Sequence, residues 1–461
     1  MKNLTLENIA AVCGGTYHGK DDLRTCEVNS ITTDSREASE GCLFAAIAGE
    51  RVDGHDYIGK AADKGAMAVL CEKEPAEDIP YILVKSTLEA LQKTAAYYLE
   101  QLNIPVVGIT GSVGKTSTKE TIASVLAQKY RTLKTPGNFN NELGLPLTVF
   151  RLRDEDEIAV LEMGISHFGE MSLLAKIARP ETCVFTNIGT AHLEYLKDRD
   201  GIFRAKTEML EYMKPEGSIV LNGDDDKLSA LKEYKGIRPV FYGFGAENDV
   251  RAENVKSLGF EGTDFRMILD GNAFDVHMPV PGRHMVMNAL AAAAVGHIYG
   301  LTDEEIRAGI GAVETLKGRF HVVRTPRYLV ADDCYNANPV SMKASLDILK
   351  EGRGRRVAIL GDMGELGEKE KDFHREVGRH AAECGIDLLI CAGPLSGNMA
   401  EAAREYNPSL PVVYETDRDS LMQKLPGLLK DGDTILVKAS HFMQFEKIVD
   451  YLIPDQSSST I

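Results

Sequence analysis

The sequence predicts an α/β protein that divides into roughly three domains. Its 461 residues are 44% hydrophobic, so the chain can bury a sizeable core in each domain. From residue 106 onward, short apolar runs alternate with helical patterns, and this alternation begins afresh after residue 318. Such alternation is typical of parallel sheets that carry helices on both faces. We therefore expect domains over residues 1–103, 104–317 and 318–461.

The first hundred residues predict a small domain of short strands. Strand-like runs lie at Gly41–Ile47 and Ala66–Leu70, and tight turns separate them. A helical pattern from Leu88 to Leu102 then leads to Pro105. Because a proline so close to the end of a helical pattern favours a break, we expect a domain boundary near Asn103.

The middle and last thirds each predict a largely parallel sheet. In the middle third, segments long enough for crossover helices separate the strands expected at Val106–Thr110, Ile158–Met163, Cys183–Ile188 and Ser218–Asn222. An alternating stretch over Val250–Met278 then predicts antiparallel strands, and Asn288–Val295 predicts an Ala-rich helix. In the last third the expected strands are Tyr328–Ala331, Val357–Leu360, Leu388–Cys391 and Thr434–Val437.

Composition excludes several function classes. A formal net charge of −17 argues against a nucleic-acid surface. No uninterrupted apolar stretch approaches the length of a membrane span and the first residues lack a secretory pattern, so we expect a cytoplasmic protein. The 8 cysteines show no C-x-x-C pairing and mostly lie beside apolar runs, so we interpret them as reduced core thiols rather than a disulfide or zinc framework.

A glycine-bracketed loop follows the first strand of the middle domain. It reads Gly111-Ser112-Val113-Gly114-Lys115-Thr116-Ser117 and opens a helical pattern. The two glycines let the backbone turn sharply and aim N–H groups at phosphate oxygens, while Lys115 supplies a cation and Thr116 a hydroxyl suited to Mg²⁺. A simple glycine turn is the alternative. The order of strand, loop, lysine, hydroxyl pair and helix favours nucleoside triphosphate binding.

Two further polar side chains follow strands at the same sheet edge. Glu162 closes an apolar strand, where a carboxylate is costly unless it meets a cation, so we interpret it as a Mg²⁺ ligand rather than a structural ion pair. His192 follows the next strand of the sequence. A lone histidine in a loop carries little information, and His192 gains weight only because Glu162 and Thr116 should lie nearby.

Three other features carry weaker signals. Lys206 lies in an amphipathic helical pattern, and its composition alone predicts a solvated side chain. The run Asp332–Pro339 is a polar cluster at a strand end, which favours ligand contact over a simple turn. Arg319 lies at the expected hinge between the second and third domains, where it would meet phosphate on domain closure or serve as an ordinary surface arginine.

These motifs together resemble the Mur ligase family of peptidoglycan synthesis, and the likeness covers nearly the whole chain. The matching residues, in order, are Thr110–Thr116, Glu162, Ala191-His192, Ala205-Lys206, Asn288–Ala292 and Gly318-Arg319. A second set resembles the subgroup that adds D-alanyl-D-alanine to UDP-N-acetylmuramoyl-tripeptide: Thr32–Arg36, Gly41–Phe44, Asp53–His55, Asn138–Pro146, Asp333–Pro339 and Leu360–Gly367.

The resemblance implies a small α/β domain for the UDP end of the substrate, a central P-loop ATPase domain with a parallel sheet, and a C-terminal Rossmann-like domain. It also implies a reaction. The tripeptide carboxylate attacks the γ-phosphate of ATP to give an acyl phosphate, and the amine of D-alanyl-D-alanine then displaces phosphate through a tetrahedral intermediate. A monomer that uses ATP and two Mg²⁺ ions is expected.

Roles at the phosphates and the metals are carried over residue by residue. The resemblance implies that the loop from Gly111 to Ser117 cradles ATP, with Lys115 on the β- and γ-phosphates. Thr116 and Glu162 would hold the first Mg²⁺. His192 and Lys206 would hold the second, with Lys206 carbamylated by CO₂ so that a cation becomes an anionic ligand. Arg319 would stabilise the transferring phosphoryl group.

Roles at the nucleoside and the substrate follow in the same way. The resemblance implies that Asn288 meets adenine and Asp333 meets ribose. It places Ser35 and Arg36 at uridine, and the substrate contacts of the later domains at Asn140, Asn141, Tyr335, Asn336 and Asn338. The first two of these would face the muramoyl-peptide, and the last two asparagines would face the reacting ends.

The chain departs from the family pattern at three places. It has His284-Met285 where His-Asn is common, and Ala439-Ser440-His441 where Gly-Ser-Arg is more usual after a lysine. Both departures put local nucleotide or substrate contacts in doubt. The third is Ser112-Val113 in place of Thr-Asn, and a cradle of N–H groups does not depend on those side chains.

Two alternatives remain at this point. The sister ligase that adds the third residue to UDP-N-acetylmuramoyl-dipeptide shares the Asp34-Ser35-Arg36 and Asp53-Gly54-His55 patterns, but its Asp-Asn-Pro-Arg stretch is not found in this sequence. A non-catalytic nucleotide-binding module is the second alternative. Lys115, Glu162, His192 and Lys206 together exceed what binding alone requires.

Overall fold

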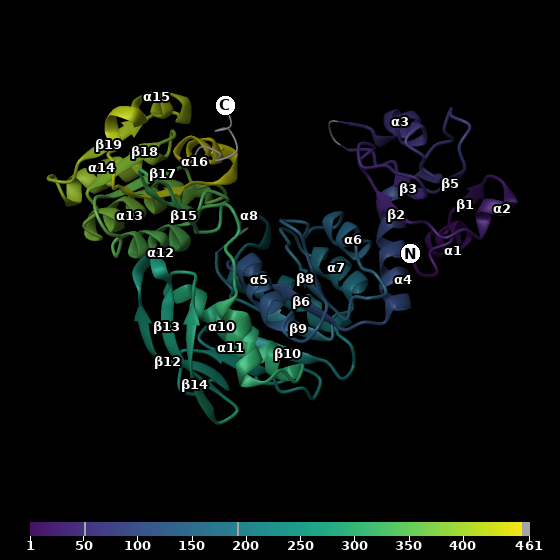
Figure 1. Cartoon of the computed structure of the whole chain (residues 1–461), viewed down its shortest axis with the longest axis horizontal. Coiled ribbons are helices and arrows are strands. Elements are labelled where there is room, and N and C mark those ends of the chain that lie inside the picture. The colour runs from purple at the N-terminus through teal and green to yellow at the C-terminus, as the bar shows by residue number, and fades with distance from the viewer. Residues whose placement is uncertain (50–51, 191–192, 454–461) are drawn as a thin grey trace. The chain divides into compact units, whose positions relative to one another are not determined.

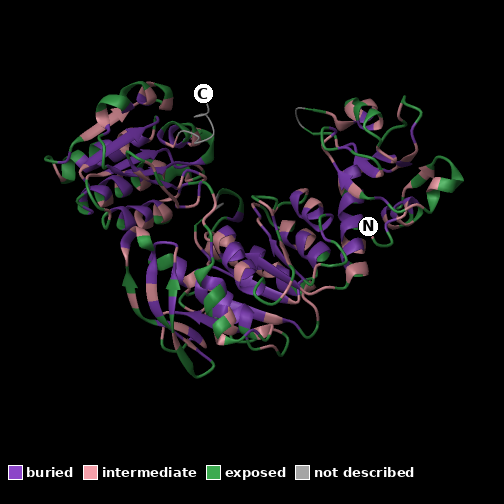
Figure 2. Ribbon diagram, viewed as in Figure 1, coloured by how far each residue is buried: buried purple, intermediate pink, exposed green. Residues whose placement is uncertain are grey.

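The computed structural model describes residues 1–49, 52–190 and 193–453 (Figure 1). The chain forms two compact units. The first unit comprises Met1–Gly189, Asp200–Val240 and Val295–Leu301, and the second comprises Thr190–Arg199, Phe241–Ala294 and Thr302–Ile461. Sheets lined by buried strands and covered by helices recur in both units (Figure 2), so the α/β fold class is confirmed.

A five-stranded sheet of order β1-β5-β4-β3-β2 opens the first unit. Strands β2 to β5 pair in parallel, and β1 is antiparallel to β5. Both β3 and β4 are buried along their whole length, which explains the two apolar runs of this part of the sequence. The elements are α1 (Leu6–Cys13), β1 (Thr16–His18), α2 (Asp21–Arg24), β2 (Ser30–Thr32), β3 (Cys42–Ala45), η1 (Gly54–Tyr57), α3 (Ile58–Asp63), β4 (Ala68–Cys71) and β5 (Tyr81–Leu83).

Helix α4 (Thr87–Leu102) connects this sheet to the next one within the first unit. The Ser86 side chain caps its N-terminus, and Asn103 ends it in a left-handed conformation with φ of 51°. The helix packs against α1 on one side and against α6 and α7 on the other. The fully buried Tyr98 donates a hydrogen bond to the carbonyl oxygen of Leu152 at 2.7 Å. The predicted boundary near Asn103 therefore coincides with a helix end.

Five parallel strands of a nine-stranded sheet lie in the first unit, in the order β10-β9-β6-β8-β7. The chain leaves the central strand β6 toward β7 and β8 on one side and returns to β9 and β10 on the other, so the loop after β6 lies at a topological switch point. Its elements are β6 (Val106–Thr110), α5 (Lys115–Leu126), β7 (Thr132–Lys134), α6 (Gly144–Val149), β8 (Ile158–Glu162), α7 (Glu170–Ala178), β9 (Thr182–Phe185), α9 (Arg199–Thr207), η2 (Glu208–Tyr212) and β10 (Ser218–Asn222).

The second unit contains the predicted antiparallel strands. Strand β12 pairs with β13 and β13 with β14, both antiparallel, while the short β11 runs parallel to β12. Helix α10 spans Arg283–Ile298, so it begins five residues before the Ala-rich segment Asn288–Val295 that was expected to form it. The elements are α8 (Leu193–Leu196), β11 (Val240–Gly243), β12 (Val250–Ser257), η3 (Gly259–Glu261), β13 (Thr263–Leu269), β14 (Asn272–Met278), α10 (Arg283–Ile298) and α11 (Asp303–Gly311).

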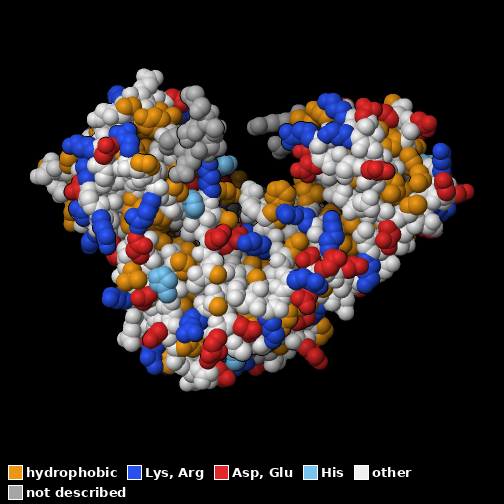
Figure 3. Space-filling view, viewed as in Figure 1, with side chains coloured by type: hydrophobic (Ala, Val, Ile, Leu, Met, Phe, Trp, Pro, Cys, Tyr) orange, Lys and Arg blue, Asp and Glu red, His pale blue; other side chains and the backbone are white. Residues whose placement is uncertain are grey.

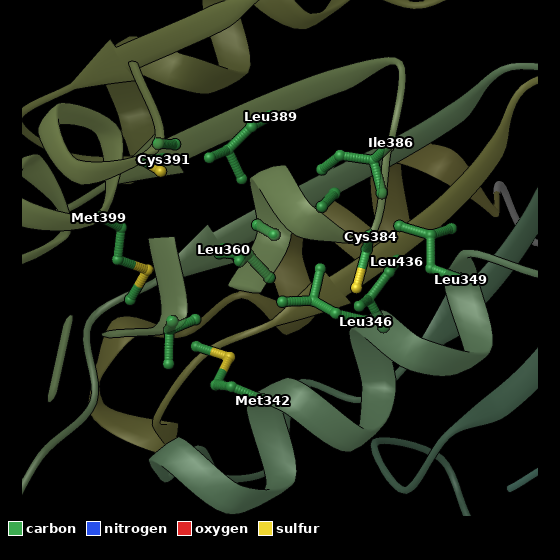
Figure 4. Close-up of a cluster of buried hydrophobic side chains, with 14 of the residues drawn as sticks. Met342, Leu346, Leu349, Leu360, Cys384, Ile386, Leu389, Cys391, Met399 and Leu436 are labelled. Atoms are coloured by element: carbon green, nitrogen blue, oxygen red, sulfur yellow. The ribbon is translucent and has the colours of Figure 1, made fainter. Parts of the chain in front are cut away.

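A six-stranded sheet of order β15-β16-β20-β17-β18-β19 completes the second unit. All neighbours are parallel except β15 and β16. One face packs on α12, α13 and α14 (Figure 4), and the other on α15 and α16. The elements are β15 (His321–Arg324), β16 (Leu329–Asp332), α12 (Pro339–Leu349), β17 (Arg356–Gly361), η4 (Gly367–Lys369), α13 (Glu370–Glu383), β18 (Leu388–Ala392), α14 (Ser396–Tyr406), β19 (Val412–Glu415), α15 (Arg418–Leu428), β20 (Thr434–Lys438), η5 (His441–Met443) and α16 (Glu446–Leu452).

Three observations concern the described chain as a whole: the state of the cysteines, the character of the helices and the charged side chains on one face. Every cysteine is free, and all but Cys26 are buried, as expected for reduced core thiols. Among the described residues, no helix combines the length and the apolar character needed to cross a bilayer. On the face shown in Figure 3, both Lys and Arg side chains and Asp and Glu side chains are exposed.

Candidate active site

The glycine loop joins the central strand β6 to the first turn of α5. Gly114 caps α5 with φ of 84°, a left-handed conformation that favours glycine. Gly111 lies so close to the end of β9 that a Cβ atom built on it would be 1.9 Å from Thr186 Oγ1. Both glycines are therefore required for the path of the loop, which ends at the N-terminus of α5.

Asn187 holds this loop in place, and sequence reasoning missed it. The backbone N–H of Val113 donates to Asn187 Oδ1 at 3.0 Å, and Asn187 Nδ2 donates to the carbonyl oxygen of Val113 at 2.9 Å. The N–H of Ser112 donates to the Asn187 carbonyl oxygen at 3.0 Å, and Ser112 Oγ accepts from the N–H of Gly189 at 2.9 Å. The run Thr186–Ile188 was noted only as a strand end, because nothing in it indicates that an amide would reach back to the loop.

Lys115 is folded over the loop it follows. Its Nζ donates to the carbonyl oxygens of Gly111 at 2.9 Å and Ser112 at 3.4 Å. These contacts hold an ammonium group above the N–H groups that a phosphate would meet.

Glu162 and Thr116, predicted separately as metal ligands, are in contact. Thr116 Oγ1 donates to Glu162 Oε1 at 3.2 Å, and Asn140 Nδ2 donates to the same oxygen at 2.7 Å. Glu162 is 1% exposed, and within the described residues its Oε2 has no hydrogen-bond donor. Because a buried carboxylate oxygen without a donor is costly, this atom fits a divalent cation that prefers oxygen ligands.

A buried lysine lies behind Glu162. Lys119 is fully buried, and its Nζ lies 3.9 Å from Glu162 Oε2, 3.0 Å from Glu120 Oε1 and 2.7 Å from the carbonyl oxygen of Thr135. Thr135 Oγ1 in turn accepts from the Glu162 N–H at 2.9 Å. Sequence reasoning did not single out Lys119. Its place one helical turn after Lys115 was visible in the sequence, but that place does not reveal the contact with Glu162.

Lys206 is buried rather than solvated. It is 1% exposed, and its pKa is held well below the usual range of a lysine, first by burial and then by the positive charge of Lys115. This shift favours the neutral amine, which is the nucleophilic form of a lysine. The composition-based expectation of a solvated side chain was wrong, because α9 turns this residue into the core. The other residue expected at the second metal, His192, lies outside the described residues.

Asn140 and Asn141 occupy structural positions in the same unit. Asn140 donates to Glu162 as described above, and its carbonyl oxygen accepts from the N–H of Gly164 at 2.9 Å. Asn141 Oδ1 accepts from the N–H of Gly144 at the start of α6 at 2.8 Å. Asn140 therefore positions Glu162, and Asn141 positions the start of α6. Contact of either side chain with a muramoyl-peptide would be an additional role.

Ser35 and Arg36 lie in the loop that follows strand β2 of the first sheet. Ser35 is 8% exposed, whereas the Arg36 side chain is 87% exposed and forms an ion pair with Asp34. Hydrogen bonds from Arg36 lower the pKa of Asp34 to about 2. The neighbouring Asp53–His55 pattern is a structural link, because His55 bonds Asp53 through Nδ1 at 2.6 Å and accepts the N–H of Glu72 at Nε2.

In the second unit, Asp333 is tied into the polypeptide. Its Oδ2 accepts from Lys438 Nζ and from Ser345 Oγ, each at 2.6 Å, and its Oδ1 accepts from the N–H of Phe320 at 3.1 Å. Lys438 is 2% exposed and also donates to the carbonyl oxygen of Asn336 at 3.1 Å. Asp333 thus holds the loop after β16 against β20, and contact with a ribose would be an additional role.

Arg319 and the Tyr335–Asn338 loop lie together in the second unit. The Arg319 guanidinium lies 4.0 Å from the centroid of the Tyr335 ring, and the His441 ring stacks on Tyr335 at 5.7 Å between centroids. Asn338 caps α12 in a capping box with Ser341. Asn336 is exposed, and its Oδ1 accepts the N–H of Ala337.

Asn288 lies on α10, where its Nδ2 is 3.2 Å from Met285 Sδ, and it is 7% exposed. His284, which precedes the departure from the family pattern at Met285, is a member of the same helix. Burial lowers its pKa, the negative charge of Asp333 opposes that shift, and the positive charge of Lys438 adds to it. These effects together favour the neutral imidazole of His284.

Replacement of Gly111 tests the phosphate loop. Gly111→Ala is expected to weaken ATP binding by at least about tenfold while the chain stays folded, because the added methyl group forces the loop away from Thr186. Calorimetric titration with ATP and Mg²⁺ measures the effect. Gly427→Ala, whose added Cβ meets nothing within 4 Å, is the matched control. Equal ATP affinity in both variants would contradict the assignment of the loop.

Family models and curated relatives both match this chain over most of its length. Three family models match, described as "Mur ligase family, catalytic domain" over residues 27–111, "Mur ligase middle domain" over residues 109–296 and "Mur ligase, glutamate ligase domain" over residues 318–441. The UDP-N-acetylmuramoyl-tripeptide–D-alanyl-D-alanine ligase of Bacillus subtilis is 39% identical over 97% of this chain and 98% of its own length. That of Escherichia coli is 35% identical over 97% and 98%.

Solved structures of MurF enzymes are also similar to this chain. MurF from Acinetobacter baumannii superposes with a TM-score of 0.88 at 33% identity, covering 98% of this chain and 99% of that one. MurF ligase from Thermotoga maritima, in complex with ADP, superposes with a TM-score of 0.79 at 31% identity, covering 91% and 96%.

Proposed function

The chain belongs to the Mur ligase family, and from this premise we infer that it joins D-alanyl-D-alanine to UDP-N-acetylmuramoyl-tripeptide. It is an ATP-dependent ligase of peptidoglycan precursor synthesis. The observation that carries the substrate assignment is the similarity, over nearly the full length of both chains, to enzymes named for this reaction. The domain division at residues 103 and 317 stays a prediction, supported by the residues that the three family models match. Monomeric state and cytoplasmic location also stay predictions.

The reaction needs a carboxylate to attack a polyanion, so its main requirements are charge neutralisation and alignment. The loop N–H groups and Lys115 orient the phosphates, and the tripeptide carboxylate attacks the γ-phosphorus to form an acyl phosphate and ADP. The amine of D-alanyl-D-alanine then attacks the acyl carbon, and phosphate leaves from the tetrahedral intermediate. Mg²⁺, when bound, neutralises charge on the phosphate oxygens.

Thr116 and Glu162 are the residues that would hold the first Mg²⁺. Their mutual contact at 3.2 Å and the donor-free Oε2 of Glu162 support this assignment. In this proposal Asn140 orients the carboxylate through its hydrogen bond to Oε1, and Lys119 balances the carboxylate charge from behind.

Lys206 would contribute to a second site as a carbamate. The neutral amine attacks the carbon of CO₂, a proton is released, and a cationic side chain becomes an anionic one. The burial of Lys206 and the lowered pKa of its amine support this step, because only the neutral amine has the free electron pair that the step requires. His192 would be its companion.

An assay of phosphate release with three substrates tests the function. Phosphate release is expected only when ATP, UDP-N-acetylmuramoyl-tripeptide and D-alanyl-D-alanine are all present, and tripeptides that end in lysine or in diaminopimelate are compared side by side. The sister activity is tested in parallel with UDP-N-acetylmuramoyl-dipeptide and either free amino acid. Turnover with the dipeptide and none with the tripeptide would overturn the assignment.

Replacement of Arg319 tests its proposed role at the phosphoryl group. Arg319→Ala is expected to lower kcat by about 10²-fold or more with little change in the Kd of ATP, as for a lost electrostatic stabiliser. Arg319→Lys keeps the charge but loses the planar stacking on Tyr335, so it should recover only part of kcat. A parallel rise in the ATP Kd would show that Arg319 serves binding instead. Arg375→Ala, which removes an exposed pair with Glu401, is the control.

A further inference from the structure

Four side chains with metal-binding donors lie together where α12 meets α13. Asp347 comes from α12, His380 and Glu383 from α13, and Cys384 is the residue that ends α13. One donor atom each of Asp347, His380 and Cys384 lies within 4.8 Å of the other two. His380 Nε2 is 2.8 Å from Asp347 Oδ1, and Cys384 Sγ is 3.6 Å from the same oxygen.

We propose that these residues form a binding site for a transition-metal ion, with Zn²⁺ as its occupant. A set of one sulfur, one nitrogen and one oxygen donor suits Zn²⁺ and does not suit Mg²⁺, which prefers oxygen alone. Bonds of about 2.0–2.3 Å in tetrahedral geometry place neighbouring donors roughly 3.3–3.7 Å apart. The Cys384–Asp347 separation already has this value, and the His380–Asp347 hydrogen bond needs to open by about half an ångström.

The far side of the His380 ring supports the assignment. Its Nδ1 faces Glu383 Oε2 at 3.8 Å, so the ring has a carboxylate on the nitrogen that points away from the cluster. Metal-bound histidines in proteins commonly carry such a partner, which fixes the ring tautomer and its orientation. Asp347 is 60% exposed and His380 24% exposed, so an ion can enter from solvent, and a fourth ligand position remains open.

The charges of the cluster match a divalent cation. Cys384 lies at the rim of the core, beside Leu346 and Leu349 (Figure 4), and is 5% exposed. Binding of Zn²⁺ forms a bond to Sγ and releases the thiol proton to solvent. One thiolate and one aspartate then balance the two positive charges.

Such a site links two helices that the fold packs together but does not bond covalently. Helix α12 carries Ser345, the partner of Asp333, and its first turn follows Asn338. Occupancy is expected to stabilise the six-stranded domain by mass action, since the cluster is assembled only in the folded chain. The ligase reaction does not use it.

Titration of the full chain, freed of metal by a chelator and dialysis, with Zn²⁺ and with Co²⁺ tests the proposal. We expect one tight Zn²⁺ site by calorimetry, a rise in thermal midpoint with Zn²⁺, and a thiolate-to-cobalt charge-transfer absorption with Co²⁺. Excess Mg²⁺ should not compete. The absorption identifies the cysteine, so it separates this site from binding of the same ions at Glu162.

Variants assign the ligands. Cys384→Ser should abolish the charge-transfer absorption and lower Zn²⁺ affinity by at least about tenfold, and Glu383→Gln should lower affinity by about tenfold through its effect on the histidine. His167→Gln is the matched control, because His167 pairs with Glu170 at 3.0 Å in the same manner but, among the described residues, is not part of a cluster of three metal-binding side chains. If Cys384→Ser does not fold, Asp347→Asn and His380→Gln, at helix positions nearer solvent, provide the same test. Unchanged affinity in these variants, or Co²⁺ binding without the absorption, would overturn the proposal.

Discussion

Replacing Lys206 with alanine is expected to lower kcat by about 10³-fold or more, the range found when a preorganised electrostatic group is removed from a reaction centre. Short carboxylic acids such as formate or acetate are expected to restore part of this loss. The reason is the burial of Lys206: the shortened side chain leaves a space in which a small carboxylate can stand where the carbamate would be. Phosphate release, measured against acid concentration, gives the result.

Two controls separate this chemistry from damage to the fold. Lys206→Met keeps the volume of the side chain and should be as inactive as Lys206→Ala, but should not be rescued. Lys214→Ala, which removes a lysine paired with Glu181 near the protein surface, should keep full activity. A fully active Lys206→Ala enzyme would remove Lys206 from the metal site, and a loss without rescue would remove the carbamate.

The pH dependence of stability gives an independent readout. In the absence of CO₂, the folded chain leaves Lys206 neutral over a pH range in which the unfolded chain binds a proton there, because the pKa is lowered by burial. The unfolded state then binds more protons, so the free energy of unfolding rises with pH up to the ordinary pKa of lysine. Lys206→Met should lack this contribution to the slope in denaturant titrations.

Lys115→Ala is expected to abolish ADP formation in the presence of both substrates, with a fall in kcat/KM for ATP of about 10³-fold or more. Lys115 is the cation of the loop, and its ammonium group is already held over the loop carbonyls of Gly111 and Ser112. Lys115→Arg should remain far below wild type, because a planar guanidinium does not fit the point-charge position of a lysine beside phosphate.

The variant also gives an internal check on the site. Because the positive charge of Lys115 helps to lower the pKa of Lys206, Lys115→Ala should raise the pKa of the Lys206 amine relative to wild type. Isotope-edited NMR of lysine side chains would follow this shift. Turnover of Lys115→Ala at the wild-type rate would refute the phosphate assignment, whatever the NMR result.

Much of the fold was predictable from sequence because the strands that build the sheets are buried on both faces. Val106–Thr110 and Ser218–Asn222 were predicted with the bounds found in the structure. The short strands Thr132–Lys134, His321–Arg324 and Val412–Glu415 were missed. Each is partly exposed along its length, so its residues give no continuous apolar signal.

The candidate site was predictable where one local pattern carries the chemistry. The order of glycines, lysine and threonine fixes the phosphate loop, and a carboxylate at the end of an apolar strand indicates Glu162. The supporting residues were not predictable. Asn187, Lys119 and Lys438 act through partners 16 to 105 positions away in sequence, so only the folded chain shows that they meet.

The ion pair of Lys119 with Glu162 bears on when Mg²⁺ would be bound at the proposed site during the catalytic cycle. With the carboxylate already countered from behind, the free protein offers an incoming divalent ion one hydroxyl and one half-satisfied carboxylate. Mg²⁺ sites of this kind take their remaining oxygens from substrate phosphates. If Thr116 and Glu162 hold Mg²⁺ as proposed, residence of the ion would be a property of the nucleotide complex, and exchange of ADP for ATP would also renew the metal.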